Sequence, residues 1–116
     1  MSRKPARKKQ DEMIQEEIEK LNELFVMLDD DKKQLAERVI ERVAFMTITL
    51  EILENNIKTK GPVILFKQGK QQMHIENPAQ KSYNTMINRY TAAYNSLFNL
   101  LPKDIVSDED EEFDNF

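Results

Sequence analysis

Near the N-terminus, apolar residues recur at the spacing of one helix face. In residues 11–28 the apolar positions lie alternately four and three residues apart, and mostly charged or polar residues fill the positions between them. This spacing predicts an amphipathic helix with a single apolar stripe. The stripe comprises Ile14, Ile18, Leu21, Phe25 and Leu28. Asp31, with Gln34 three residues later, resembles the capping box of a second helix.

The second predicted helix, residues 32–57, is apolar on two sides. One stripe has heptad spacing: Val43, Met46, Leu50, Leu53 and Ile57. The other has an apolar residue at every fourth position: Ala36, Ile40, Ala44, Ile48 and Ile52. Because a helix that is apolar on two sides must be covered on two sides, we expect a second copy of the chain to cover part of it. The expected oligomerisation residues are Ile40, Ala44, Ile48, Leu50 and Ile52. The alternative is one wide core stripe in a monomeric bundle.

The period of the pattern changes after Gly61-Pro62. Two short apolar-rich runs flank a turn and predict a β-hairpin at about 62–76. A tight turn at Gln68-Gly69 would pair Ile64 with Met73 and Val63 with His74.

The last predicted helix begins at Asn77-Pro78, with Asn as the cap and Pro at the first helical position. Apolar and tyrosine residues then repeat at helical spacing up to Pro102: Tyr83, Ile87, Tyr90, Tyr94, Leu97 and Leu101. The tyrosines could stack on bases, but their spacing favours a core stripe. The predicted fold is therefore mainly α: a helical hairpin of long antiparallel helices with a short β-hairpin at one end, preceded by an N-terminal helix.

The formal net charge of -4 hides two termini of opposite sign. Residues 1–10 contain five cations and no acid, and residues 103–116 contain seven acids and one lysine. We expect both to be disordered, a basic arm at 1–10 and an acidic tail at 103–116, around a helical oligomerisation domain at 11–102. The arm either binds nucleic acid, or is a solubilising tail, or meets the acidic tail of another subunit; these readings stay open.

The expected contact residues divide into two sets. The DNA-binding candidates are Arg3, Lys4, Arg7, Lys8 and Lys9, and after them Lys58, Lys60, Lys67 and Lys70. The candidates for binding a protein partner combine acids with two aromatic anchors: Asp108, Glu109, Asp110, Glu111, Glu112, Phe113 and Phe116.

Few residues could support catalysis. The chain has no cysteine and one histidine, His74, which we interpret as a structural or surface residue because a metal site needs further ligands. Carboxylate pairs such as Glu37 with Glu41 have the spacing of solvated helix faces. We therefore expect no enzyme activity, no metal and no cofactor.

No apolar run approaches the roughly 20 residues that span a bilayer, and no apolar stretch follows the basic N-terminus. We therefore expect a cytoplasmic protein without a membrane partner.

The run LEILENNIKTKGPVILFKQGKQQMHIENPAQKSYNTMINRYTAAYNSLFNLL resembles the small subunit of bacteriophage terminases, over about residues 35–101. The resemblance lies in the order of Gly61, Gly69 and Asn77-Pro78 behind a long helix. It implies a non-catalytic subunit of a ring that binds double-stranded viral DNA in the host cytoplasm. It also implies a partner, the large terminase subunit, which holds the ATPase and nuclease. The N-terminal part shows no clear helix-turn-helix, so phosphate contacts are expected rather than site-specific readout.

A second reading belongs to a different class. The chain could be an oligomeric helical adaptor, chaperone-like or antitoxin-like, that uses its charged termini for protein partners. Salt-sensitive binding to duplex DNA would favour the terminase reading.

Overall fold

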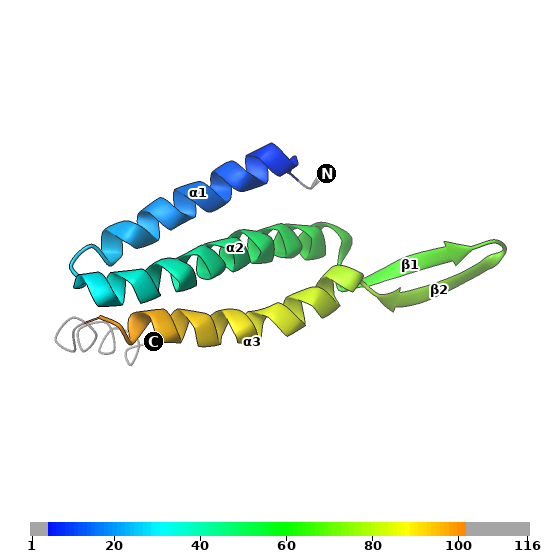
Figure 1. The fold of residues 1–116 in the computed structure, drawn as a ribbon. Helices are drawn as coiled ribbons and strands as arrows, with labels where there is room; N and C mark the ends of the chain where they lie inside the picture. Colours follow the sequence, from blue (N-terminus) through cyan, green and yellow to red (C-terminus); the bar gives the residue numbers. More distant parts are fainter. Residues whose placement is uncertain (1–4, 102–116) are drawn as a thin grey trace.

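The computed structural model describes residues 5–101, which form three helices and one β-hairpin. In chain order these are α1 (Arg7–Leu24), α2 (Asp30–Lys60), β1 (Val63–Gln68), β2 (Gln71–Glu76) and α3 (Pro78–Phe98). α2 runs toward the β-hairpin and α3 runs back beside it, with α1 along the other side of α2 (Figure 1). The predicted fold class is therefore confirmed. The molecule is elongated, with principal-axis extents of 62 × 35 × 21 Å.

α1 begins and ends four residues earlier than predicted. It spans Arg7–Leu24, so residues 7–10 are helical rather than part of a disordered arm. Phe25 and Leu28 fall in the turn that follows, yet both are buried, at 2% and 6% exposure. Their apolar spacing therefore predicted burial correctly and helical conformation wrongly.

α2 is longer than predicted at both ends. Its cap is Asp29 rather than Asp31, because the Asp29 carboxylate accepts a 2.9 Å hydrogen bond from the backbone N–H of Lys32. The helix passes through Asn55-Asn56 and ends at Lys60. Gly61 follows at φ 86° and ψ 167°, a backbone conformation that is open almost only to glycine.

The β-hairpin is present, but its predicted register was wrong by two residues. Ile64 pairs with Ile75 and Phe66 with Met73 in an antiparallel ladder. The turn is Gly69-Lys70, not Gln68-Gly69, and Gly69 has φ 60°. Glycine at the first position of a two-residue turn is typical of type II′, whose twist suits a hairpin.

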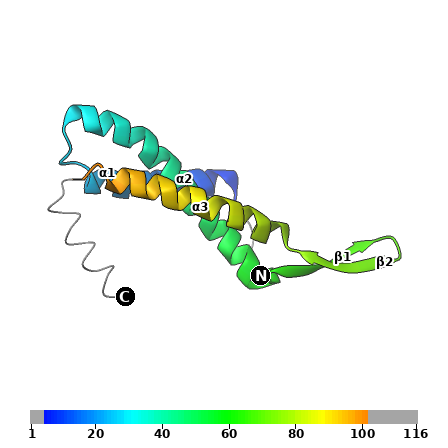
Figure 2. The same cartoon turned by 90° about the horizontal axis from the view of Figure 1, so that it is seen from below.

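Both sides of α2 are covered within one chain. α1 packs on one side and α3 on the other, and Figure 2 shows α2 crossing the two. The core lies mainly at the end where α1 turns into α2, and its buried members are Leu21, Phe25, Leu28, Ala36, Ile40, Val43, Ala44, Leu97 and Leu101. Tyr90 and Tyr94 pack against this cluster, as their spacing predicted.

The predicted oligomerisation residues are therefore corrected. Ile40, Ala44, Ile48 and Leu50 are all at most 5% exposed within a single chain, and Ile52 is half-buried. They stabilise the monomer, since α1 and α3 already supply the two covers that the pattern required.

Candidate nucleic-acid interface

The β-hairpin projects beyond the helical body and is held firmly at its base (Figure 1). Asn77, only 3% exposed, lies at this base. Its backbone N–H donates to the carbonyl of Pro62 at 2.7 Å, and its side-chain Nδ2 donates to the carbonyl of Gly61 and to Oδ1 of Asn56, both at 2.9 Å. The same side chain caps α3 by accepting from the N–H of Ala79 at 3.0 Å. One buried residue thus fixes the hairpin relative to α2 and α3.

The ladder gives the hairpin two different faces. Residues that pair directly share a face, and successive pairs alternate. Ile64–Ile75 and Phe66–Met73 form one face, which is wholly apolar near the base. Phe66 and Met73 remain 43% and 54% exposed. The other face consists of Val63–Glu76, Leu65–His74 and Lys67–Gln72.

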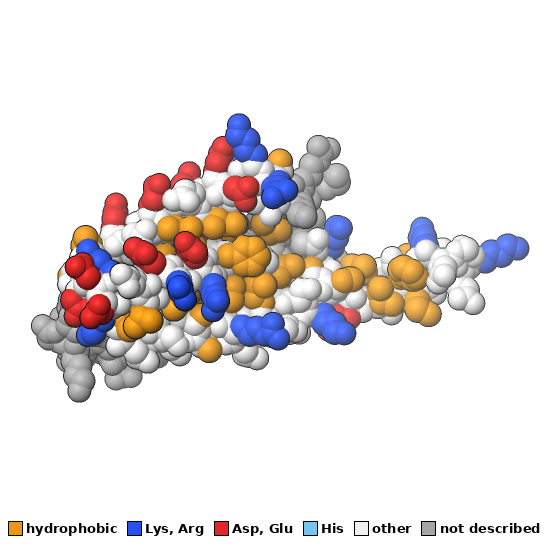
Figure 3. All heavy atoms as spheres, in the orientation of Figure 1, with side chains coloured by type: hydrophobic (Ala, Val, Ile, Leu, Met, Phe, Trp, Pro, Cys, Tyr) orange, Lys and Arg blue, Asp and Glu red, His pale blue; other side chains and the backbone are white. Residues whose placement is uncertain are grey.

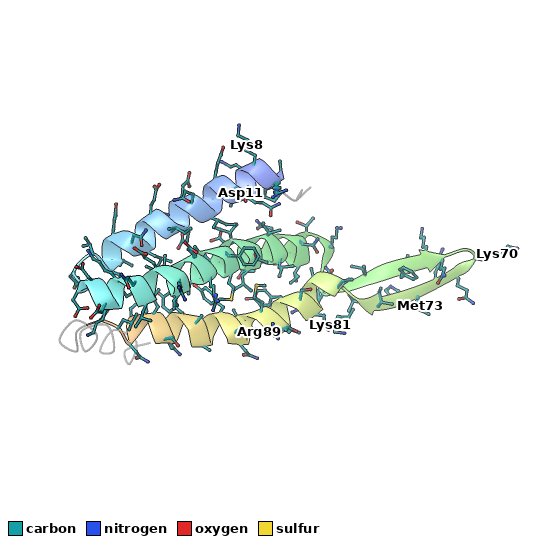
Figure 4. The ribbon with its side chains drawn as sticks, in the orientation of Figure 1. Lys8, Asp11, Lys70, Met73, Lys81 and Arg89 are labelled. Carbon is teal, nitrogen blue, oxygen red and sulfur yellow. The ribbon has the colours of Figure 1, made fainter. Side chains whose placement is uncertain are left out.

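Lysines lie at the base and at the tip of the projection. Lys67 and Lys70 are exposed near the turn, and Figure 4 labels Lys70 at the tip. Lys58 and Lys60 are exposed in the last turn of α2. Cations at a helix C-terminus also interact favourably with the helix dipole, so this second pair has a structural role as well.

The basic residues at the start of α1 lie toward the same end of the molecule. Both ribbon views place the N-terminal end of α1 on the side of the β-hairpin (Figures 1 and 2). Arg7, Lys8 and Lys9 are exposed in the first turn of α1, where the dipole disfavours cations. Their charge therefore does not help the helix to form. Arg3 and Lys4 lie outside the described residues.

A groove between α2 and α3 was missed by the sequence analysis. It encloses about 690 Å³ and is lined by Glu41, Arg42, Phe45, Met46, Lys81, Ser82, Thr85, Met86 and Arg89. Figure 3 shows hydrophobic side chains gathered over the middle of the body, with basic side chains below them, and Figure 4 labels Lys81 and Arg89 on α3. Phe45 is 53% exposed. The only sequence signal was Met46 in the heptad stripe.

The predicted partner-binding residues, Asp108 to Phe116, lie outside the described residues.

His74 is exposed and pairs with Leu65 on the hairpin. Within residues 5–101, no group of three or more histidine, cysteine, aspartate or glutamate side chains could hold a metal ion. None of the helices in this part of the chain is long and apolar enough to cross a membrane.

One ionisable pair links α2 to α3. The hydroxyl of Tyr83 donates to Oε1 of Glu54 at 3.3 Å. Burial raises the pKa of Tyr83, and the negative charge of Glu54 and the hydrogen bond to it raise it further. This pair favours a neutral tyrosine at ordinary pH and stabilises the helix pair.

Comparison with protein-family models, with curated proteins and with solved structures finds no match to this chain.

Proposed function

We propose that this chain is a non-catalytic DNA-binding subunit of the terminase small-subunit type, acting as a homo-oligomer in the host cytoplasm. The observation that carries the proposal is the anchored β-hairpin, which projects lysines from one end of the body. The major groove of duplex DNA is wide enough to admit a two-stranded β-ribbon. Lys67 and Lys70 would then contact phosphates or base edges near the hairpin tip.

The cations of α1 support the same assignment. Arg7, Lys8 and Lys9 add positive charge at the end of the molecule where the hairpin begins, although the helix dipole disfavours them there. Neutralising phosphates gives such residues a favourable partner. The net charge of -4 does not oppose DNA binding, because the negative excess comes from the seven acids of residues 104–116, and the rest of the chain has 17 bases and 14 acids.

The signature residues of the resemblance support it independently. Gly61 ends α2 with positive φ, Gly69 forms the hairpin turn, and Asn77 caps α3 with Pro78 at its first turn. Each of these residues is needed to build the helix–hairpin–helix arrangement. Glycine and Asn-Pro at these places are thus what the architecture implied by the resemblance would require.

The apolar face of the hairpin supports an oligomer. An isolated two-stranded hairpin is at best marginally stable in water. Exposed Phe66 and Met73 would therefore gain from contact with a neighbouring subunit. Because each is already about half covered, the gain is roughly half of the 1.5–3 kcal/mol for burying a fully exposed side chain. In a ring, hairpins of several subunits would act on one duplex, and each weak contact would gain effective concentration from the others.

The experiment is a fluorescence-anisotropy titration of a labelled duplex with the full chain. We expect binding that weakens as salt rises, and a loss of affinity when Arg7, Lys8 and Lys9 are all changed to Gln. Substitution is preferable to deletion of residues 1–10, because residues 7–10 belong to α1. A chain that shows no salt-sensitive duplex binding would favour the helical adaptor instead. We expect the pure chain to hydrolyse neither ATP nor DNA, since the large subunit would supply both activities.

A further inference from the structure

The groove between α2 and α3 has an apolar floor and a mostly basic rim. Phe45, Met46 and Met86 supply apolar side chains, and Phe45 is 53% exposed. The charged lining residues are Arg42, Lys81, Arg89 and the single acid Glu41. Three cations against one carboxylate leave an excess of two positive charges. An exposed apolar surface with a polar rim is typical of an interaction site, and this one requires an acidic occupant with apolar side chains.

One segment of this chain has that composition. Residues 104–116 contain seven acids and no base, and two aromatic residues, Phe113 and Phe116, stand among the acids. We propose that this C-terminal segment docks into the groove of its own chain. The two phenylalanines contact the apolar floor, and the neighbouring carboxylates lie beside Arg42, Lys81 and Arg89.

The length of chain beyond α3 is sufficient for this contact. Leu101 lies fifteen residues after Met86, so a helical path between them measures about 22 Å. Phe113 follows Leu101 by twelve residues, which reach up to about 40 Å when extended. The segment can therefore fold back along α3 and still have slack at the turn.

Other occupants match the groove less well. The corresponding face of a second copy carries the same excess of positive charge and would be repelled. Duplex DNA supplies negative charge but no aromatic side chains for the floor. The docking does not depend on the proposed DNA function. If the chain binds DNA as proposed, the docked segment would also screen the cations of this face and direct the DNA to the β-hairpin end.

The test uses the full chain, which contains no cysteine, so one introduced cysteine is a unique labelling site. Asn115→Cys creates one site for a nitroxide label, and the methionine methyl groups are observed by NMR with methyl-¹³C labelling. The label should broaden the signals of Met46 and Met86 in the groove and spare that of Met73 on the projecting hairpin. Reducing the nitroxide should restore the lost intensity. No broadening at Met46 and Met86, or equal broadening at Met73, would overturn the proposal.

Two controls define the contact. Arg42→Glu with Arg89→Glu, both at exposed positions, should abolish most of the broadening, whereas Lys8→Glu with Lys20→Glu on α1 should not. Equal effects of the two charge reversals would contradict docking at this groove. A second control mixes two kinds of chain: one carries the nitroxide but no ¹³C, and the other carries ¹³C-methyl methionine but no nitroxide. This mixture should show no broadening. Broadening of Met46 and Met86 in that mixture would assign the groove to the tail of another copy and overturn docking within one chain.

Discussion

Asn77 donates a 2.9 Å hydrogen bond through Nδ2 to Oδ1 of Asn56, joining the start of α3 to the last turns of α2. The same Nδ2 donates to the carbonyl of Gly61, where the chain leaves α2 for the hairpin. Because Asn77 is buried, each of these polar groups would lose a partner if its side chain were removed. The direction of the β-hairpin therefore depends on one amide.

Asn77→Ala should lower the free energy of unfolding by about 1–3 kcal/mol, because α3 loses its cap and the half-buried acceptors on Asn56 and Gly61 lose their donor. Asn77→Asp separates the two roles. Its carboxylate can still cap α3, but it places a second acceptor against Asn56 and Gly61, so we expect little recovery. Urea denaturation measures both variants, with the exposed Asn84→Ala as the matched control. Wild-type stability of Asn77→Asp would show that the donor role is unimportant.

Both glycines with positive φ should be sensitive to substitution. At Gly61, φ 86° and ψ 167° lie in a region that other residues rarely enter, and Ala should cost about 1–3 kcal/mol. At Gly69, φ 60° at the first position of the turn also favours glycine, and an added Cβ meets no atom within 4 Å. Gly69→Ala should therefore cost about 1–3 kcal/mol from backbone conformation alone. Thermal or urea unfolding of the two variants measures the loss, and wild-type stability of either variant would contradict the strain assigned to that glycine.

Tyr83 should make stability fall at alkaline pH. Its pKa in the folded chain is raised above 10.0, so the unfolded chain loses the phenolic proton first. The contribution of Tyr83 is fully present below the unfolded pKa and is lost as pH rises through the folded one. Denaturation from neutral pH to beyond the usual tyrosine pKa of about 10 should show a smaller loss for Tyr83→Phe than for the wild type. An identical loss in both proteins would assign the alkaline instability to other groups.

Periodicity was enough to predict the order of the elements and the start of α3. The change from a helical to an alternating pattern after Gly61 marked the β-hairpin, and Asn77-Pro78 marked the α3 cap because both residues act locally. The register was not predictable in the same way. It depends on whether Gly69 occupies the first or the second turn position, and either choice keeps a plausible apolar pairing.

The covering of α2 shows what a pattern leaves undetermined. The stripes that contain Ile40 and Leu50 required partners on two sides of the helix, but the pattern did not say whether those partners belong to the same chain. α1 and α3 supply them. The groove at Phe45 was missed for a related reason: exposure at that position depends on how α2 and α3 cross, which spacing within one helix does not specify.

The apolar hairpin face should mediate assembly. Phe66→Thr with Met73→Thr keeps residues suited to a strand and removes the exposed apolar side chains, so the mass measured by light scattering should fall. Leu65→Thr, on the opposite face, is the control and should leave the mass unchanged. A wild-type mass of 13.7 kDa at micromolar concentration would contradict an oligomer.

The salt dependence of duplex binding tests the central claim most directly, with the hairpin lysines as the variable. Each phosphate contact contributes about 0.9 to the slope of log affinity against log salt, so Lys67→Gln with Lys70→Gln should make the slope shallower by about 1.8 per engaged hairpin. Lys32→Gln with Lys33→Gln, at the opposite end of α2, is the matched control and should leave the slope unchanged. A shallower slope for the hairpin variant alone is the predicted result. Equal slopes for the wild type and both variants would contradict the β-hairpin as the DNA-binding element.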